Sequence, residues 1–306
     1  MLADAFSRSG FVCCLDVMKT KTYLMMTGAL VALGTAGWMV AQDMPEHGGQ
    51  VPPVTSMQSG YHFLSTRVYS AAEDQRILEL FQGLRTTDVS DGLDSVGLPN
   101  AGTLDPDIAP LWIDAENYAH CFVGFAVTAR FVPSQEPRKI RTESEFEYFA
   151  ANWYQNRAPD HFQHLLRPGS VLVIDDDSNK DVGTVSASSV LNWKTRGCVG
   201  VVTNGGVRDS DEIMTQKTPV YYKKAGRGIR AGRVELESVN RPVVVGEVCV
   251  MPGDVIVADG DGVVLVPRVH AERVARYAQR IRHHDREDRA QLYDQLAMPQ
   301  DISFRK

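Results

Sequence analysis

The sequence predicts an α/β fold, and two patterns carry that prediction. Between residues 122 and 266, short runs of valine and isoleucine alternate with stretches whose apolar residues recur at helical spacing. Turns rich in glycine, proline and aspartate separate these segments. Strands and helices that alternate at such short intervals favour an α/β arrangement over an all-β one. The composition, 43% hydrophobic and 23% charged, is that of a globular chain able to bury a core without disulfides.

The expected elements follow from local apolar spacing and from turn residues. Helical spacing predicts helices over 71–83, from 86 onward, and over 146–166, 188–196, 212–215 and 271–296. β-Branched runs predict strands over 122–131, 171–174, 199–202, 220–222, 243–245, 247–250, 255–258 and 263–266. Gly83 ends the first helix, and a serine or aspartate within 86–91 caps the second. Residues 259–262, Asp-Gly-Asp-Gly, join the last two strands as a hairpin turn.

The N-terminal segment has the pattern of a secretory signal. Lys19 and Lys21 precede residues 22–42, an apolar stretch without a charged residue, and Met18 is a natural start for such a signal. We therefore expect a signal peptide or an uncleaved membrane anchor over 1–42, a linker over 43–64 and the main domain over 65–298. A buried core helix is the alternative explanation of the apolar stretch. With the signal in use, the protein is exported, periplasmic or membrane-anchored; without it, the protein is cytoplasmic.

The motif with the clearest chemistry is the pair Arg208-Asp209. A β-branched strand leads into Gly205-Gly206 and delivers the pair near its carboxyl end, where open α/β sheets usually place ligand-binding groups. The two glycines let the backbone turn sharply or approach a ligand closely. The guanidinium of Arg208 offers a planar fork suited to a carboxylate, and Asp209 offers a hard oxygen suited to Mg²⁺. Taken alone, adjacent Arg and Asp residues are more often a surface pair or a helix cap.

Four segments of the chain, spread over about 200 residues, resemble segments that occur in the same order in one known family. Residues 197–209 resemble the signature strand and Arg-Asp loop of the "regulator of ribonuclease E activity A"-like (RraA-like) family. Residues 87–94 resemble its first helix start, 168–175 the strand before its catalytic loop, and 252–259 with 261–267 its closing hairpin. The resemblance implies a compact α/β/β domain with mixed sheets. It also implies assembly as homotrimers or homohexamers, with sites between protomers.

The resemblance assigns roles to the residues of this motif and of a helix start. Arg208 would grip the carboxylate of a pyruvate-like 2-oxo acid substrate, and Asp209 would hold Mg²⁺ or Mn²⁺, directly or through water. Backbone amides at Ser186-Ala187-Ser188-Ser189 would bind the same carboxylate, because helix N-termini suit anions. Cleavage of a C–C bond beside a 2-oxo acid leaves an enolate, whose charge a metal stabilises. Decarboxylation of oxaloacetate passes through the same pyruvate enolate.

The chain departs from the family pattern at the acid that handles protons. The resemblance implies an acidic residue followed, after about twenty residues, by the Arg-Asp pair, as in the family's aldolases. Counting back from Arg208 with this spacing places Ala187 at the position of the acid. Ser186 stands where the family has glycine. A small insertion in the loop would bring Asp181 to the same place, and the run Asp175-Asp176-Asp177 offers further candidates. Without one of these acids the resemblance implies metal and carboxylate binding but not aldolase turnover.

Other polar groups have ordinary explanations. A hairpin turn accounts for Asp259 and Asp261 at least as well as a metal site does. Asp88, Asp91 and Asp94 at a helix start are more often caps. The last predicted helix is rich in arginine, but its interleaved acids favour a solvated face.

Charge and cysteine usage narrow the class of partner. The net charge of −6 gives no reason to expect a nucleic-acid partner. Glu272 is a candidate for the terminal acid that family members take from a neighbouring protomer. Cys121, Cys198 and Cys249 lie among apolar residues and are expected to be small buried hydrophobes rather than a zinc set.

These patterns leave three functions open. The first is a divalent-metal-dependent lyase, of the class II pyruvate aldolase type, acting on a 4-hydroxy-2-oxo acid (as 4-hydroxy-4-methyl-2-oxoglutarate aldolase does) or on oxaloacetate. The second is a noncatalytic binding protein, like family members that restrain ribonuclease E. The third is a different carbonyl reaction at the same Arg-Asp and metal site. An export signal disfavours the second function, and the residue at Ala187 disfavours the first.

Overall fold

The computed structural model describes residues 53–136, 139–178 and 181–304. The chain separates into two compact units, residues 1–61 and residues 62–306. In the described part of the first unit the chain forms the short helix α1 (Val54–Gln58), which buries no residue. The predicted secretory segment 1–42 lies outside the described residues, as do residues 43–52 of the predicted linker. Among the residues that the structure does describe, no helix has the length and apolar character needed to cross a membrane.

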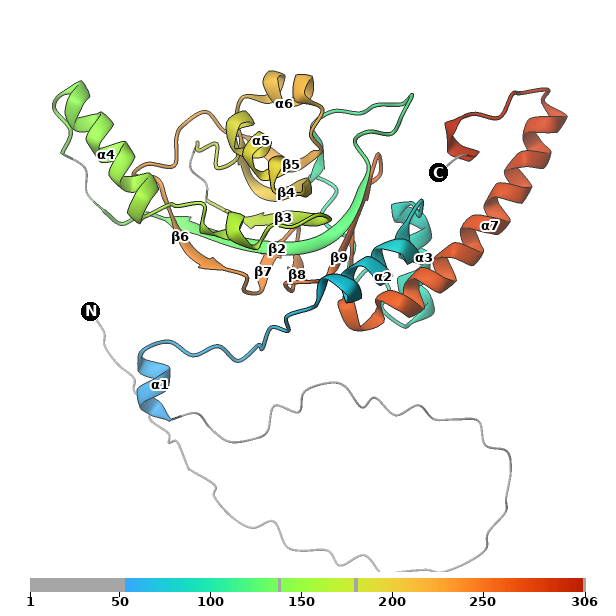
Figure 1. Ribbon diagram of the computed structural model, residues 1–306, viewed down its shortest axis with the longest axis horizontal. Coiled ribbons are helices and arrows are strands. Elements are labelled where there is room, and N and C mark those ends of the chain that lie inside the picture. The colour runs from blue at the N-terminus through green and yellow to red at the C-terminus, as the bar shows by residue number, and fades with distance from the viewer. Residues whose placement is uncertain (1–52, 137–138, 179–180, 305–306) are drawn as a thin grey trace, which may run out of the picture. The chain divides into compact units, whose positions relative to one another are not determined.

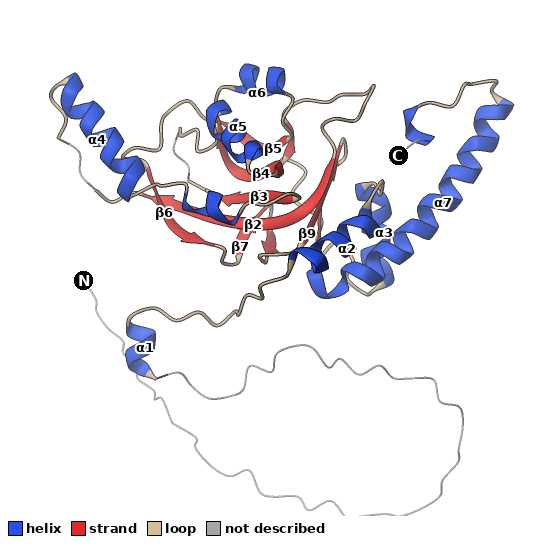
Figure 2. Ribbon diagram, viewed as in Figure 1, coloured by secondary structure: helices blue, strands red, loops and turns tan. Residues whose placement is uncertain are grey.

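A mixed sheet forms the centre of the second unit (Figure 2). Its strands are β1 (Ala109–Pro110), β2 (Phe122–Pro133), β3 (Ser170–Asp175), β4 (Cys198–Val207), β5 (Val220–Ala225), β6 (Val234–Val239), β9 (Val255–Asp259) and β10 (Gly262–Val266). Their spatial order is β1-β5-β4-β3-β2-β9-β10, with β6 also paired to β2. Strands β2, β3, β4 and β5 pair in parallel, whereas the flanking pairs are antiparallel. The predicted α/β class with a mixed sheet is confirmed.

The two faces of the sheet are covered differently. On one face, helices α5 (Ala187–Thr195) and α6 (Ser210–Gln216) pack over an apolar cluster that includes Leu172 and Trp193. On the other face, the hairpin of β7 (Val243–Val245) and β8 (Val248–Val250) packs in a second apolar cluster, which includes Val171 of β3. Figure 1 shows α5 and α6 on one side of the sheet and β7 on the other. A helical layer, a sheet and a second small sheet give the α/β/β arrangement implied by the resemblance.

A third apolar cluster holds three helices against β9 and β10. These are α2 (Ala71–Phe81), α3 (Thr86–Ser95) and the long α7 (Ala271–Gln295). Helices α3 and α7 pack closely, since a β-carbon added at Gly92 would lie 2.8 Å from the carbonyl oxygen of Val274. The predicted last helix and the predicted β9–β10 hairpin are both confirmed.

The prediction of one helix over residues 146–166 is wrong. The chain forms α4 (Glu143–Asn156) and then a separate 3-10 helix, η1 (His161–Leu165). Pro159 explains the break, because proline has no amide hydrogen and disfavours a helical conformation in the residue before it. The amide of Ala158 accordingly closes α4 by donating to Trp153 O at 2.9 Å.

Smaller departures concern a cap, two strands and a cysteine. The N-cap of α3 is Arg85 rather than a serine or aspartate, and its amide donates to Asp88 Oδ2 at 2.9 Å. Strand β4 extends to Val207, beyond the predicted end at residue 202. The sequence did not predict β6, because its alternating Val-Glu-Leu-Glu pattern is short and follows an arginine-rich turn. Cys249 is exposed because it alternates outward on β8, whereas Cys198 is buried as expected.

Candidate functional site

A cavity of about 260 Å³ lies where the ends of β4 and α5 meet. The residues that line it are Tyr154, Gly183, Thr184, Ser186, Ser188, Ser189, Arg208, Asp209, Ile229 and Arg230. The cavity therefore brings together Arg208, Asp209 and the three serines that the sequence singled out. Ala187 does not line it. Its side chain packs into the apolar cluster beneath α5 and is 6% exposed, so position 187 offers the cavity no side chain.

The residues before α5 lie beside the end of β4 and fix Arg208. The amide of Arg208 donates to Val185 O at 2.9 Å, and the amide of Val185 donates to Gly206 O at 3.2 Å. A β-carbon at Gly206 would come within 1.9 Å of Val182 O. Neither Gly205 nor Gly206 has a positive φ. Of the two roles that the glycine pair allowed, a sharp turn is therefore excluded, and Gly206 instead lets the chain's own loop approach the strand closely.

Arg208 and Asp209 contact each other at the rim of the cavity. Arg208 Nε donates to Asp209 Oδ1 at 3.3 Å, and each side chain is 32% exposed. Asp209 is the N-terminal boundary residue of α6 and adopts the left-handed conformation, with φ 59° and ψ 42°. Aspartate tolerates this region better than most residues, but such strained positions cluster at functional sites. The weak, partly exposed contact leaves the guanidinium fork accessible to an anion.

The N-terminus of α5 supplies a second anion-binding element. Ser186 caps the helix, and its hydroxyl lies 3.0 Å from the hydroxyl of Ser189. First-turn amides such as those of Ala187 and Ser188 have no intrahelical partner, and the helix dipole places partial positive charge beside them. A carboxylate in the cavity would therefore meet amide hydrogens, hydroxyl groups and the Arg208 guanidinium together.

Sequence reasoning missed the other wall of the cavity, which Tyr154, Ile229 and Arg230 form. Arg230 is buried, and its Nη1 donates to Asp160 Oδ1 at 2.6 Å and to Ala158 O at 3.1 Å. Its guanidinium carbon lies 5.6 Å from the centre of the Tyr154 ring. Arginine recurs at every third residue in this turn, but that pattern does not indicate which arginine is buried.

The alternative acids do not line the cavity. Asp181 accepts from the backbone amide and the side chain of Arg227, and these bonds hold the pKa of the Asp181 carboxyl below its ordinary value. Asp175 accepts from Asn204 and from the amide of Val244. Asp176 is fully buried and accepts a hydrogen bond from Thr184 Oγ1, so it lies behind the cavity wall.

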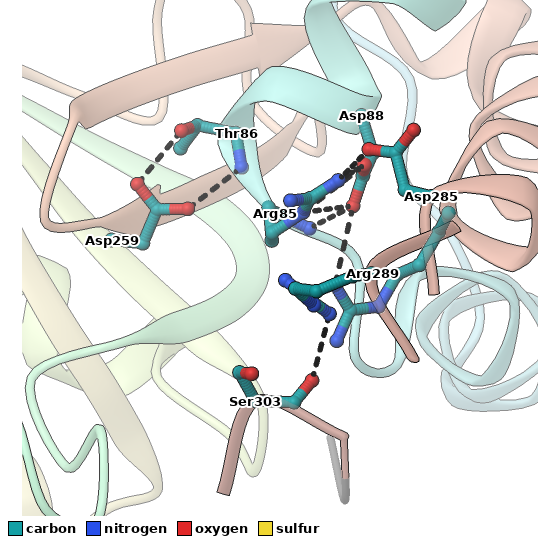
Figure 3. A network of polar contacts seen from close by, with 8 residues as sticks. Arg85, Thr86, Asp88, Asp259, Asp285, Arg289 and Ser303 are labelled. Carbon is teal, nitrogen blue, oxygen red and sulfur yellow. Dashed lines mark hydrogen bonds and ion pairs between the residues drawn. The ribbon is translucent and has the colours of Figure 1, made fainter. Parts of the chain in front are cut away.

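Asp88 and Asp259 have structural roles, as Figure 3 shows. Asp259 accepts from the amide and the hydroxyl of Thr86, at 2.8 and 2.7 Å, and so joins the β9–β10 turn to the start of α3. Asp88 accepts from Arg85, which also reaches Asp285 on α7 at 2.6 Å. These carboxylates hold α3 in place.

The other acidic residues that the sequence offered as candidates also do not line the cavity. Asp91 and Asp94 are exposed on α3, and Asp261 lies in the β9–β10 turn. Glu272 pairs with Arg76 at 2.7 Å and with Arg276 at 2.8 Å, which are ordinary surface contacts.

The oxygen donors of the cavity fit a metal site in which most ligands are water and substrate oxygens. Within the described ranges no three His, Cys, Asp or Glu side chains converge to hold an ion. Among the residues that line the cavity, Asp209 is the one carboxylate. Mg²⁺ commonly keeps several waters and takes only one or two protein carboxylates together with substrate oxygens. The residues therefore fit a hydrated Mg²⁺ or Mn²⁺ held by Asp209, water and substrate, but not an all-protein cage.

Comparison with protein families identifies the chain. The model of the RraA-like family, described as Aldolase/RraA, matches residues 86–265, which is more than half of the sequence. The chain therefore belongs to the RraA-like family. The matched region contains all the residues that line the cavity.

Relatives in this family are distant. A relative from Halalkalibacterium halodurans is 32% identical over 115 residues, 37% of this chain and 53% of the relative. Protein DlpA of Legionella pneumophila is 27% identical over 203 residues, 65% of this chain but 28% of that protein. The chain thus spans about half or less of these two proteins. A Thermus thermophilus protein named 4-hydroxy-4-methyl-2-oxoglutarate aldolase is 27% identical over 170 residues, 53% of this chain and 90% of that protein.

Solved structures share the fold. A protein from Pseudomonas syringae, 22% identical, has a TM-score of 0.56 over 77% of this chain and 97% of its own. Streptomyces coelicolor RraAS2, described as an unusual member of the RNase ES inhibitor RraA family, is 20% identical. Its TM-score is 0.58 over 71% of this chain and 98% of its own. The relatives and neighbours thus include a protein named as an aldolase and an unusual member of a family of RNase inhibitors.

Proposed function

We propose that this protein is a divalent-metal-dependent lyase that releases pyruvate from a 4-hydroxy-2-oxo acid or decarboxylates oxaloacetate. One observation carries the proposal: Arg208, Asp209 and the N-terminus of α5 line the same cavity. These groups match the needs of 2-oxo acid chemistry, which are a carboxylate grip and a hard oxygen ligand. The name of the Thermus relative supports the same reaction class.

Each part of the site has a defined task in this reaction. The Arg208 guanidinium and the first-turn amides of α5 bind and orient the substrate carboxylate. Asp209, with substrate and water, would hold Mg²⁺ or Mn²⁺, which supplies Lewis-acid stabilisation of an enolate oxygen when bound.

A noncatalytic regulatory role is the second candidate. The observation in its favour is that the residues lining the cavity include no carboxylate besides Asp209, and that Ala187, where the count back from Arg208 places the family's acid, packs into the core. The likeness to RraAS2, at 20% identity, extends only to the fold.

Assembly and location are part of the proposal. We infer a homotrimer or homohexamer from family membership, and export from the pattern of residues 1–42. Light scattering that gives a monomer would oppose the first inference. Fractionation that finds the uncleaved chain free in the cytoplasm would oppose the second.

The decisive experiment is a pyruvate-release assay over a panel of 4-hydroxy-2-oxo acids and oxaloacetate. We expect turnover with Mg²⁺ or Mn²⁺ that EDTA removes and added metal restores. Release that is absent under all conditions, from a folded protein, would favour the regulatory role instead.

A further inference from the structure

Two arginines line the cavity, but they differ in what holds them. The Arg208 side chain is 32% exposed, and its guanidinium donates a 3.3 Å hydrogen bond to its neighbour Asp209. Arg230 has a side chain that is 5% exposed and forms an ion pair with Asp160 at 2.6 Å. Only Arg208 therefore presents a readily available cation to a ligand.

Aromatic rings and the local backbone hold Arg230 in place. Its guanidinium carbon lies 5.2 Å from the centre of the Phe131 ring and 5.6 Å from that of Tyr154. Asp160 is fixed in turn, since Trp193 Nε1 donates to its Oδ2 at 3.3 Å. A buried pair held this way does not release its arginine to a second anion without leaving the aspartate unpaired, which is costly.

The other residues that line the cavity on the wall of Arg230 are uncharged, whereas Arg233, which does not line the cavity, donates to Ile229 O at 3.0 Å. The neighbours of Arg230 in the cavity are the Tyr154 ring and the half-buried Ile229 side chain. Positive charge is instead concentrated at Arg208 and the N-terminus of α5. One part of the cavity suits a carboxylate and the other suits an uncharged group.

We propose that the preferred substrate carries one carboxylate, at its 2-oxo end, and an uncharged tail that packs against Tyr154 and Ile229. This inference rests on the proposed lyase function and selects among its substrates. In the reaction the C3–C4 bond breaks and its electron pair becomes the pyruvate enolate. The proton leaves the C4 hydroxyl as the aldehyde forms, and C3 gains a proton to give pyruvate. A second carboxylate on C4 would face Ile229, Tyr154 and an arginine already neutralised by Asp160.

A matched substrate pair tests the inference. 4-Hydroxy-2-oxopentanoate and 4-hydroxy-2-oxoglutarate differ only in the group on C4, which is a methyl in the first and a carboxylate in the second. With Mg²⁺ present, we expect kcat/KM for the methyl substrate to exceed that for the carboxylate substrate by at least about tenfold. A preference for the carboxylate substrate overturns the inference and leaves the lyase function standing.

Variants test the physical cause. Asp160→Asn removes the charge that neutralises Arg230, so the ratio of the two kcat/KM values should move at least about tenfold toward the carboxylate substrate. Ile229→Lys places a new cation on the same wall and should move the ratio in the same direction, which keeps the test valid if Asp160→Asn does not fold. Asp181→Asn is the control, since it frees Arg227 in the same region but outside the cavity, and its ratio should equal that of the wild type.

The outcomes separate the two claims. Unchanged ratios in both folded variants overturn the role of Arg230 and Ile229 in specificity. A wild-type protein that releases pyruvate from neither substrate, nor from any other 2-oxo acid, overturns the lyase function and this inference with it.

Discussion

The side-chain stem of Arg208 lies directly against the α-carbon of Gly183. A β-carbon added at Gly183 would come within 2.6 Å of both Cβ and Cγ of Arg208, closer than real contacts allow. The position of the guanidinium thus depends on a missing side chain in a different segment of the chain.

Gly183→Ala is therefore expected to displace Arg208. We predict a fall in kcat/KM for pyruvate release of about tenfold or more, mainly through KM, because the carboxylate grip moves. The control is Gly260→Ala, where the added β-carbon would meet nothing closer than His120 Nε2 at 3.8 Å. Equal kinetics for the two variants would show that the packing of Gly183 does not position Arg208.

Arg208→Lys keeps the positive charge but loses the planar fork. Because the carboxylate is held in the transition state as well as in the ground state, kcat/KM should fall by about tenfold or more, about 1.4 kcal/mol. Steady-state kinetics on the preferred 2-oxo acid measure this. If Arg208 merely pairs with Asp209, the variant will keep wild-type kinetics.

Asp209→Asn is expected to abolish metal-dependent turnover while leaving the fold intact. Asparagine tolerates the left-handed conformation of this position, so backbone strain is unchanged and the lost charge is the variable tested. Calorimetric titration with Mg²⁺ should show binding to the wild type, in the presence of a 2-oxo acid, and none to the variant. Wild-type affinity in the variant would refute the metal site.

Thr184→Val should destabilise the protein. Thr184 Oγ1 donates to Asp176, and the two residues are 1% and 0% exposed. Valine matches threonine in shape but leaves the buried carboxyl without this donor, which costs about 1–3 kcal/mol. Thermal unfolding should show a melting temperature roughly 2–10 °C lower. Thr184→Ser retains the hydroxyl and should lose much less; an equal loss would mean that the methyl group, not the hydrogen bond, matters.

Asp254 should make stability depend on pH. Burial raises the pKa of its carboxyl to about 6, from an ordinary 3.8, although the amides of Met251 and Arg268 donate to it. A raised pKa means that the folded state binds the proton more tightly, so the stabilising contribution is complete below pH 4 and is lost as the pH rises through 6. Relative to Asp254→Asn, the wild type should lose about 3 kcal/mol at most across this window. Chemical denaturation at pH 4, 5, 6 and 7 measures it; parallel curves for the two proteins would contradict the shift.

The sequence by itself determined the local features. Two β-branched runs and the Asp-Gly-Asp-Gly turn between them predicted the β9–β10 hairpin, and the β-branched run that leads to Arg208-Asp209 predicted a strand with polar groups near its carboxyl end. Helix α5 was predicted over 188–196 from the apolar spacing of adjacent residues, and the structure begins it at Ala187. These signals are readable because their partners lie within one or two turns of the chain.

The tertiary structure alone decided what surrounds the Arg-Asp pair. Arg230 and its partner Asp160 lie 70 positions apart, and Tyr154 comes from a helix that the sequence pattern had merged with the next segment. Counting positions placed the family's acid at Ala187, but packing turned that side chain into the core and put the buried Asp176 behind the cavity wall. Sheet order brings these distant segments together, and no local periodicity records which residues it will place in contact.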